Sequence, residues 1–334
     1  MKTSKLLAAA MAFIIPSALL FTGCNLSFFN TINYKYDDAD KYTAGDREIT
    51  EKVTSINIDY LSGDVVLNGN DTDKVTVKET ANKNMTEDQM VHTWVNDGTL
   101  YVRYCASKNG ISVDKLEKSL EITVPGAQDL NDLIVHLSSG NFNCSGITTD
   151  NAKGQISSGN FGMKCSASDV ELKATSGNIV LTLDGDSSLT DLDTSSGNIS
   201  FTQSGNINSV KMHASSGNVA ADLEKVGTMD IRVSSGNINI EADEIGELNS
   251  SSSSGTNEFV LGNAPSKSDI RSSSGSVKVY LPEDADVTVN TSISSGEFNY
   301  DLAFAKTGKT YVCGNGTSTM DIHVSSGDVS VLKH

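Results

Sequence analysis

Serine hydroxyls beside glycine are the first groups in this sequence that could do chemistry. Ser-Gly occurs thirteen times, ten of them at the repeated corners, and five of these copies are Ser-Ser-Gly-Asn followed by an apolar residue. A serine at a sharp turn can act as a nucleophile, but it needs a partnered base to take its proton. Because no copy shows such a base, we predict a repeated geometry and no catalytic residue. The copies that define this corner and a ladder between its repeats are Ser139-Gly140-Asn141, Ser158-Gly159-Asn160, Ser196-Gly197-Asn198, Ser216-Gly217-Asn218 and Ser235-Gly236-Asn237.

The side chains that could bind a metal are scattered. The five histidines include no His-Glu-x-x-His pair, and His213 and His323 stand at strand positions expected to face solvent. Residues 68–73 and 184–186 resemble calcium loops faintly. Both lack the distal glutamate of an EF-hand and the glycine-rich nonapeptide of calcium solenoids, so we interpret them as turns. We predict neither a metal site nor a cofactor.

Four cysteines follow Cys24, and none has the CxxC spacing of a metal or redox site. They are Cys105, Cys144, Cys165 and Cys313. Cys144 and Cys165 fall where other repeats carry apolar residues, which favours two small buried side chains. A disulfide between neighbouring coils is the alternative that the spacing leaves open.

The spacing of the corner glycines predicts the elements that carry these residues. Steps of 18 to 21 residues separate them from Gly140 to Gly296, which is typical of a repeat architecture. The second, fourth and sixth residues after each glycine are mostly apolar, as are the third, fifth and seventh before it. Each half therefore predicts a short strand with one buried face. Because the buried parity changes across the glycine, the chain must turn there, and glycine reaches backbone angles closed to other residues.

Stacking of these two-strand repeats predicts an all-β fold, a parallel β-helix or solenoid of about ten coils. Strands of successive coils would pair at about 4.8 Å, and the asparagines could form a ladder. The serine before each glycine should point inward, so that Ser216→Leu would overpack the core by about 1–3 kcal/mol. A meander of antiparallel hairpins gives the same phase. We prefer the solenoid, because hairpin turns favour Asn-Gly or Asp-Gly.

The start of the chain predicts a secretory address and an anchor. Lys2 and Lys5 precede an apolar run that is short for a membrane span, which indicates a signal peptide over residues 1–23. The run ends in Gly23-Cys24, which resembles a bacterial lipobox, and we expect Cys24 to be lipidated. An uncleaved anchor is the alternative. Residues 24–45 are polar without an apolar period, and we expect them to form a lipid-anchored tether.

Residues 46–130 and the end of the array depart from the regular repeat. A degenerate first coil surrounds Gly63, and residues 94–102 predict a β-hairpin that would cap it, since an open end exposes unpaired strand edges. Residues 131–334 are the repeat array, with serines in place of apolar residues at 250–254 and an inserted loop at 304–316. The last copy, before Lys333 and His334, is expected to form a short exposed edge.

The formal net charge of −17 argues against binding of nucleic acid through a basic surface. Its simplest meaning is solubility outside the cell, and interaction with cations or the cell wall is the alternative.

Several motifs occur together as they do in one known family. They are Tyr42-Thr-Ala-Gly45, Asp97-Gly98-Thr99-Leu100, Leu120-Glu-Ile-Thr-Val-Pro125, the serial Ser-Ser-Gly copies, Gly314-Asn-Gly316 and Ser325-Ser326-Gly327-Asp328. As a set they resemble the DUF4097 family, also called "putative adhesins", over residues 42–334. The resemblance implies a right-handed β-helix in a bacterial, often membrane-attached protein, in some members beside cell-envelope stress systems. The family has no established activity, so the resemblance implies no catalytic residue.

Together these observations predict a non-enzymatic cell-surface lipoprotein, a β-solenoid scaffold or adhesin-like module with an extended binding surface. We expect it on the outer face of the bacterial cytoplasmic membrane. Its expected partners are that membrane, through the N-terminal lipid, and a cell-wall polymer, a glycan or a protein, with no nucleic acid. The alternative is a polysaccharide-active β-helix enzyme. Such an enzyme would need acidic or basic residues clustered on one sheet face, and the sequence shows no cluster.

Overall fold

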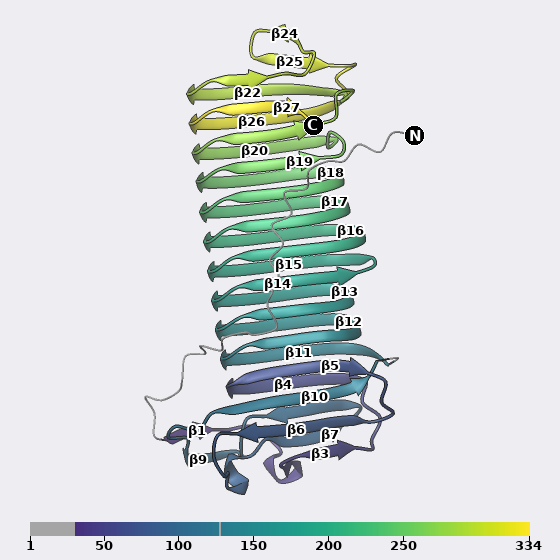
Figure 1. Cartoon of the computed structure of the whole chain (residues 1–334), viewed down its shortest axis with the longest axis vertical. Coiled ribbons are helices and arrows are strands. Elements are labelled where there is room, and N and C mark those ends of the chain that lie inside the picture. The colour runs from purple at the N-terminus through teal and green to yellow at the C-terminus, as the bar shows by residue number, and fades with distance from the viewer. Residues whose placement is uncertain (1–30, 127) are drawn as a thin grey trace.

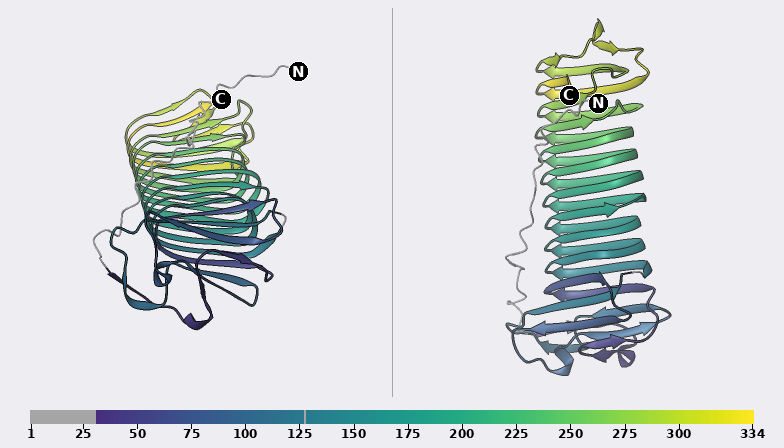
Figure 2. Two further views of the ribbon diagram at one scale, coloured as in Figure 1. Left: turned by 60° about the horizontal axis from the view of Figure 1, so that its bottom comes forward. Right: turned by 45° about the vertical axis from the view of Figure 1, so that its right-hand side comes forward.

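The computed structural model describes residues 31–126 and 128–334, so Cys24 and the predicted signal peptide lie outside the described residues. The described chain is a straight rod of stacked coils on a broader base (Figure 1). Figure 2 shows the same stack from two other sides. Within these residues the helices are two short 3-10 turns, η1 (Ala39–Lys41) and η2 (Glu87–Gln89). No helix in this part of the chain is long and apolar enough to cross a membrane. The predicted all-β solenoid is confirmed.

The strands fall into a base, an array and a tip. The base contains β1 (Thr31–Tyr34), β2 (Thr43–Ala44), β3 (Arg47–Ile49), β4 (Ser55–Ser62), β5 (Asp64–Asn70), β6 (Val75–Ala81), β7 (His92–Asn96), β8 (Thr99–Arg103), β9 (Lys108–Ser112) and β10 (Lys118–Pro125). The array contains β11 (Asp129–Ser139), β12 (Phe142–Ser158), β13 (Phe161–Ser176), β14 (Ile179–Asp184), β15 (Ser187–Ser196), β16 (Ile199–Ser216), β17 (Val219–Ser235), β18 (Ile238–Ser254), β19 (Asn257–Leu261), β20 (Lys267–Ser274) and β21 (Val277–Leu281). The tip contains β22 (Val287–Ser295), β23 (Phe298–Tyr300), β24 (Ala305–Thr307), β25 (Thr310–Cys313), β26 (Ser318–Ser326) and β27 (Val329–Lys333).

One coil shows how the repeat buries its apolar residues. Leu172 and Ala174 of β13 point into the rod, and after the corner at Gly177 the residues Ile179 and Leu181 of β14 enter the same core. All four side chains are at most 4% exposed. The buried parity therefore changes across the glycine, as the sequence predicts.

Successive coils stack in parallel and in register. Phe161 of β13 pairs with Ile179 of β14, and Ala174 of the same strand pairs with Thr194 of β15. Repeated along the array, this pairing builds two facing sheets, one from the halves before the glycines and one from the halves after them, with the apolar core between. Neighbouring strands of a hairpin meander would be antiparallel, so that alternative is wrong for the array.

The base closes the rod with antiparallel strands. β7 and β8 form the predicted hairpin, and its turn residues Asp97 and Gly98 have φ of 48° and 77°, as a type I′ turn requires. Farther out, β2 pairs with β7 and β3 pairs with β6. The outermost strands are only two and three residues long. Such short edges offer little backbone for another chain to pair with.

Residues 31–45 differ from the expected tether, because they fold onto the base. β1 pairs antiparallel with β9, and Tyr34 is only 7% exposed. The ring of Tyr42 lies 4.6 Å from that of Tyr36 and 5.6 Å from that of Trp94. The polar composition of the segment conceals these aromatic contacts, which hold it in place.

The first coil is threaded between parts of the chain that follow it. β4 and β5, on either side of Gly63, lie between β8 and β10 on one side and β11 and β12 on the other. In chain order, β4 and β5 of this coil come before β6 to β10 of the base. After β10 the chain then runs past the first coil to β11 on its other side.

The last coil is threaded in the same way, so the expectation of an exposed edge there was wrong. β26 lies between β20 and β22, and β27 lies between β21 and β23. In Figure 1 the yellow strands β26 and β27 accordingly run below β22. The insertion at 304–316 contains the hairpin β24–β25, whose second strand covers the outer edge of β22. The order of the sequence does not indicate this arrangement, because β26 and β27 follow β22 and β23 in the chain but lie between them and β20 and β21 in space.

Candidate functional site

The corner glycines form one column along the rod. Each position must be glycine because the adjacent coil leaves no space for a side chain. Their φ angles lie between +109° at Gly63 and +156° at Gly197, a region that side chains rarely adopt. A Cβ added to Gly217 would lie 1.7 Å from the carbonyl oxygen of Gly197 in the coil below. The same clash recurs between Gly177 and Gly159, at 1.5 Å. The glycines of the Ser-Gly-Asn stretch therefore let coils stack closely.

The asparagines after the glycines form a hydrogen-bonded ladder. Asn218 donates its backbone N–H and its side-chain Nδ2 to Oδ1 of Asn198, at 2.8 and 3.2 Å. Asn198 donates in the same way to Asn178, at 2.9 and 3.3 Å. The ladder starts on the carboxylate of Asp64 and continues through Asn141, Asn160, Asn178, Asn198, Asn218 and Asn237 to the backbone N–H of Thr256. These amides are consumed by the fold.

The serines before the glycines do not point inward, so that expectation was wrong. Ser196 and Ser216 are exposed, and Ser139 at the base end is the buried exception, at 8%. The residues that flank the corner explain the difference. Ala214 and Val219 are both 0% exposed and close the interior on each side of Ser216, which leaves no internal space for its side chain. The serines therefore line the outer rim of the corner.

Acidic residues gather on the outer face of the sheet formed by the strands before the glycines. Glu171 and Asp191 are paired neighbours on β13 and β15, and Asp193 follows two residues on. Lys173 Nζ lies 2.6 Å from Glu171 Oε1, and His213 Nδ1 lies 3.4 Å from Asp193 Oδ2. Partial burial raises the pKa of Asp191 above its ordinary value. Because Lys173 and His213 lie beside them and are largely exposed, these carboxylates form a charge patch at the solvent-facing surface.

A hollow of about 270 Å³ opens on the same face near the tip. Arg271 of β20, His323 of β26 and Ser292 of β22 are direct neighbours across three strands. The two long side chains stand among short hydroxyl residues, and this contrast in length makes the hollow. The lining residues are Arg271, Ser272, Ser273, Ser292, Ser294, His323, Val324 and Ser325. The sequence correctly predicts that His323 faces outward, but the threading of β26 hides its position beside Arg271.

One known family matches the part of the chain that contains the repeated corners and the threaded coils. The Toastrack DUF4097 family model matches residues 53–332, which is most of the chain. The chain belongs to this family. The resemblance inferred from the motifs is thus confirmed. No curated protein matches the sequence.

Several solved structures align with this Toastrack chain at low identity. A "putative adhesin" from Parabacteroides merdae ATCC 43184 is 10% identical, with a TM-score of 0.44, over 88% of this chain and 96% of that one. A "putative adhesin" from Parabacteroides distasonis ATCC 8503 is 13% identical, with a TM-score of 0.39, over 87% and 97%. A "putative lipid binding protein" from the same organism is 15% identical, with a TM-score of 0.31, over 87% and 97%.

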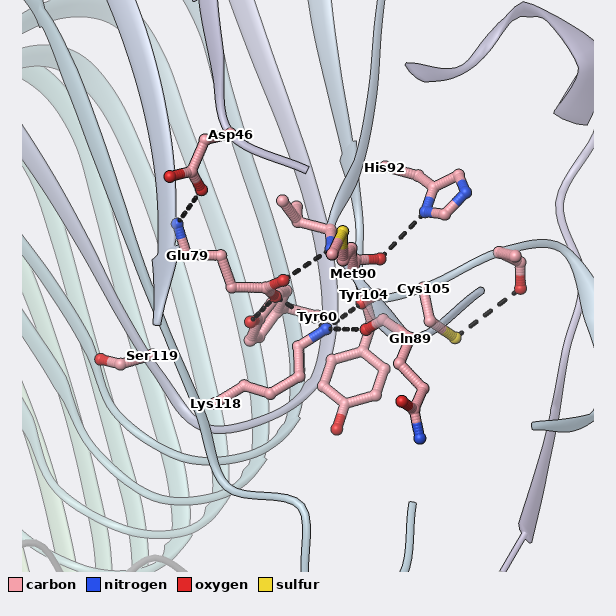
Figure 3. A network of polar contacts seen from close by, with 12 residues as sticks. Asp46, Tyr60, Glu79, Gln89, Met90, His92, Tyr104, Cys105, Lys118 and Ser119 are labelled. Atoms are coloured by element: carbon pink, nitrogen blue, oxygen red, sulfur yellow. Dashed lines mark hydrogen bonds and ion pairs between the residues drawn. The ribbon is translucent and has the colours of Figure 1, made fainter. Parts of the chain in front are cut away.

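The base of the Toastrack chain holds a buried ion pair (Figure 3). Lys118 Nζ lies 2.7 Å from Glu79 Oε1, and the two side chains are 0% and 1% exposed. Tyr60 donates its hydroxyl to the same carboxylate and Val91 donates its N–H, both at 2.7 Å. Burial lowers the pKa of Lys118 and raises that of Tyr60.

The remaining protons of this ammonium group are also bound. Lys118 donates to the carbonyl oxygens of Gln89 and Tyr104, and its Nζ lies 4.0 Å from the centre of the Tyr104 ring. All three protons of the ammonium group are thus in hydrogen bonds within the base, so Lys118 has no proton to donate to a ligand. The network therefore fastens β4, β6 and β10 to one another and is not a reactive site.

The cysteines and the predicted turns also serve the fold. Cys105, Cys144, Cys165 and Cys313 are buried and unbridged, so the disulfide left open by the sequence is not formed. Asp186, in one of the faint calcium-like turns, accepts the backbone N–H and Nδ2 of Asn206, at 2.8 and 2.9 Å. Residues 31–126 and 128–334 contain no group of three side chains that could hold a metal ion.

Proposed function

We propose that this protein is a non-enzymatic, lipid-anchored module that presents the outer face of its solenoid to a partner outside the cell. The proposal rests on a difference between two sets of polar side chains along the rod: those that hydrogen-bond within the protein and those that do not. The asparagine ladder is internally bonded, whereas the hydroxyls of Ser195, Ser196 and Ser216 make no hydrogen bond with the described residues. The same distinction recurs in successive coils, which gives a long row of groups available to a ligand.

The anchor determines which end of the rod would lie near the membrane. We propose that residues 1–23 are the signal peptide and that lipidated Cys24 begins the mature chain. Seven residue steps then separate the lipid from the start of β1, a reach of at most about 25 Å. The base would stay beside the outer face of the cytoplasmic membrane, and residues 131–334 would carry the exposed face outward. A role in envelope stress rests on the family resemblance alone.

The anchor is tested by Cys24→Ala in the full chain. We expect this variant to be released from membranes into the soluble fraction, because the lipid supplies the attachment. Cys313→Ala is the control, since that thiol is buried at the tip, and it should stay with membranes. Membrane retention of Cys24→Ala equal to that of the unchanged chain would refute the anchor.

The binding role is tested with residues 25–334, which contain every strand described here. Immobilised on beads, this fragment should retain a glycan, wall polymer or protein from intact cells, identified by mass spectrometry and sugar analysis. Residues 25–130 serve as the comparison for material that binds the base alone. Recovery of the same material on both supports would remove the array from the proposed role.

A further inference from the structure

We propose that the hollow on β20, β26 and β22 binds one unit of a neutral saccharide. This inference rests on the proposed function and adds to it a location on the rod and a class of ligand. In the hollow a guanidinium, an imidazole and several free hydroxyls surround one volume. Its chemistry therefore decides which ligand fits.

The guanidinium of Arg271 is held in place but is not saturated. It makes two bonds to Asp269, from Nε to Oδ1 and from Nη2 to Oδ2, both at 2.8 Å. Nη1 makes no hydrogen bond with the described residues. The bidentate pair fixes the plane of the group and leaves the free nitrogen as a donor to a ligand. The ring nitrogens of His323 are likewise without a hydrogen bond in the described chain, and one ring nitrogen of a neutral imidazole donates while the other accepts.

Four hydroxyls complete the lining. Ser273, Ser292, Ser294 and Ser325 make no hydrogen bond with the described residues. A hydroxyl both donates and accepts, so a row of free hydroxyls matches a ligand that carries hydroxyls of its own. Val324 is the one apolar lining residue, and it is 2% exposed. The surface that the hollow offers to a ligand is therefore mainly polar.

The charges favour a neutral ligand over an acidic one. Asp269 neutralises Arg271, and Asp321, two residues before His323, accepts a bond from Asn290 at 2.9 Å. The chain as a whole carries a net charge of −17, which repels polyanions. A neutral sugar needs no unpaired cation to bind it, and the negative net charge does not repel it.

The size and position of the hollow fit one unit of a longer chain. Its volume of about 270 Å³ is slightly below the range of about 300–1,000 Å³ for sites that hold a whole small molecule. It opens on the flat outer face of a sheet, so the ends of a polysaccharide could continue over neighbouring coils. The threaded coil is essential to it, because β26 supplies His323 and Ser325.

The array contains a matched comparison for the two long side chains. Arg232 occupies the same strand position two coils nearer the base, bonds to Asp230 at 2.9 Å and lies beside His213. In that pair the imidazole is already engaged by Asp193, and neither residue lines the hollow. Substitutions at the two arginines therefore change the same charge on the same kind of surface.

The test measures binding of defined oligosaccharides to residues 25–334 by saturation-transfer NMR and calorimetry at 0.15 M salt. The probes are maltohexaose, cellohexaose and chitohexaose, with hexagalacturonate as the charged comparison. We expect at least one neutral probe to bind more tightly than hexagalacturonate. Arg271→Ala should weaken that binding by about tenfold or more, because a buried ligand hydroxyl loses its donor. Ser292→Leu, which fills the hollow, should abolish it. Arg232→Ala should leave it within about twofold.

Any other outcome contradicts the proposal that the hollow binds a neutral saccharide. Absence of binding by all three neutral probes at 10 mM, or equal losses for Arg271→Ala and Arg232→Ala, would overturn the assignment. Circular dichroism melting shows that each variant is folded. The proposed function fails separately, if the unchanged fragment retains nothing from intact cells. If Arg271→Ala still captures the same cell-surface material, the hollow alone is wrong.

Discussion

The carbonyl oxygen of each corner glycine occupies the space where a side chain would begin in the next coil. A Cβ on Gly217 would lie 1.7 Å from Gly197 O, at a φ of +149°. We expect Gly217→Ala to lower the free energy of unfolding by about 3 kcal/mol or more, because backbone must move and an unfavourable φ is added. Urea denaturation of residues 25–334 measures this loss.

Two nearby substitutions separate the clash from other effects. Gly185 has a φ of +93° with no atom within 4 Å of an added Cβ, so Gly185→Ala should show backbone strain alone, about 1 kcal/mol. Ser216 is exposed, and Ser216→Leu should change the free energy of unfolding by less than about 0.5 kcal/mol. Similar losses at Gly217 and Gly185 would show that close stacking of the corners is not the cause.

The buried thiols give a second prediction at this scale. Burial raises the pKa of Cys105 and of Cys165 to about 12. At pH 8 neither Cys105 nor Cys165 then forms an appreciable amount of thiolate in the folded protein. Iodoacetamide should therefore leave both residues unmodified, whereas in 8 M urea both should react. Because the unfolded chain loses these protons first, stability should also fall as pH rises above about 8.5. Rapid alkylation of the folded chain, read by peptide mass spectrometry, would contradict this.

The inward or outward direction of a single residue was predictable from sequence where it depends only on the number of residues from the corner glycine. The corner glycines and the outward histidines follow from counting residues around each Ser-Gly. The exposure of Ser216 could not be predicted in this way. Inward and outward positions alternate only where a second sheet faces the strand, and at Ser216 the strand has already reached the corner of the coil. The neighbours of His323 were also hidden, since Arg271 comes beside it only through the threading of β26.

At the scale of the element, the coils near β18 to β20 are the weak part of the core. Ser250 and Ser268 occupy inward positions and are 4% and 0% exposed. Their hydroxyls, and Oδ1 of Asn257, make no hydrogen bond with any residue of 31–126 or 128–334. Asn257 does donate Nδ2 to Ser252, at 2.7 Å, so the polar groups in this stretch are only partly satisfied. A buried hydroxyl without a partner costs about 1–3 kcal/mol.

Removal of one such hydroxyl should therefore stabilise the array. We expect Ser268→Ala to raise the free energy of unfolding by about 1 kcal/mol, because alanine keeps the Cβ and deletes the unpaired oxygen. Ser273→Ala, at an outward position of the same strand, should change it by less than about 0.5 kcal/mol. Both are compared by urea denaturation at equal slope. A loss of stability in Ser268→Ala would show that its hydroxyl is hydrogen-bonded within the core.

Elements were predictable where one local signal dominates. The two strands of each coil follow from period-two alternation, and the β7–β8 hairpin follows from Asp97-Gly98. β1 was missed because the groups that hold it are distant in sequence: it pairs with β9, and the Tyr34 hydroxyl donates to the carbonyl oxygen of Asp59 at 2.9 Å. The hairpin β24–β25 was missed because its glycines indicate a loop while its second strand finds a partner in β22.

The whole molecule closes both ends by the same device. The level around Gly63 is enclosed by strands formed later in the chain, and the level around Gly327 is enclosed by strands formed earlier. In a simple stack the terminal coils would fray first, because each coil is held only by its neighbours. Here the first and last coils are each paired on both sides. The outermost strands are two or three residues long, so little edge remains for another chain to pair with.

Threading at the tip predicts that a longer fragment is less stable than a shorter one. A chain that ends after residue 317 lacks β26 and β27, so β20, β21, β22 and β23 each lose a partner and the level between them is empty. A chain that ends after residue 281 exposes only the edges of β20 and β21. Unpaired edges and uncovered apolar faces promote proteolysis and aggregation.

We therefore expect trypsin to cut residues 25–317 rapidly within 282–317, at Lys306 or Lys309, while residues 25–281 stay intact. Sedimentation velocity should show more aggregate for the longer fragment than for the shorter one, because the longer fragment has more unpaired edges. Residues 25–334 are the control, because in the complete chain β26 and β27 fill the empty level. If 282–317 resists trypsin equally in 25–317 and 25–334, then β22 is held without β26, and the last coil is not what fastens the tip to the array.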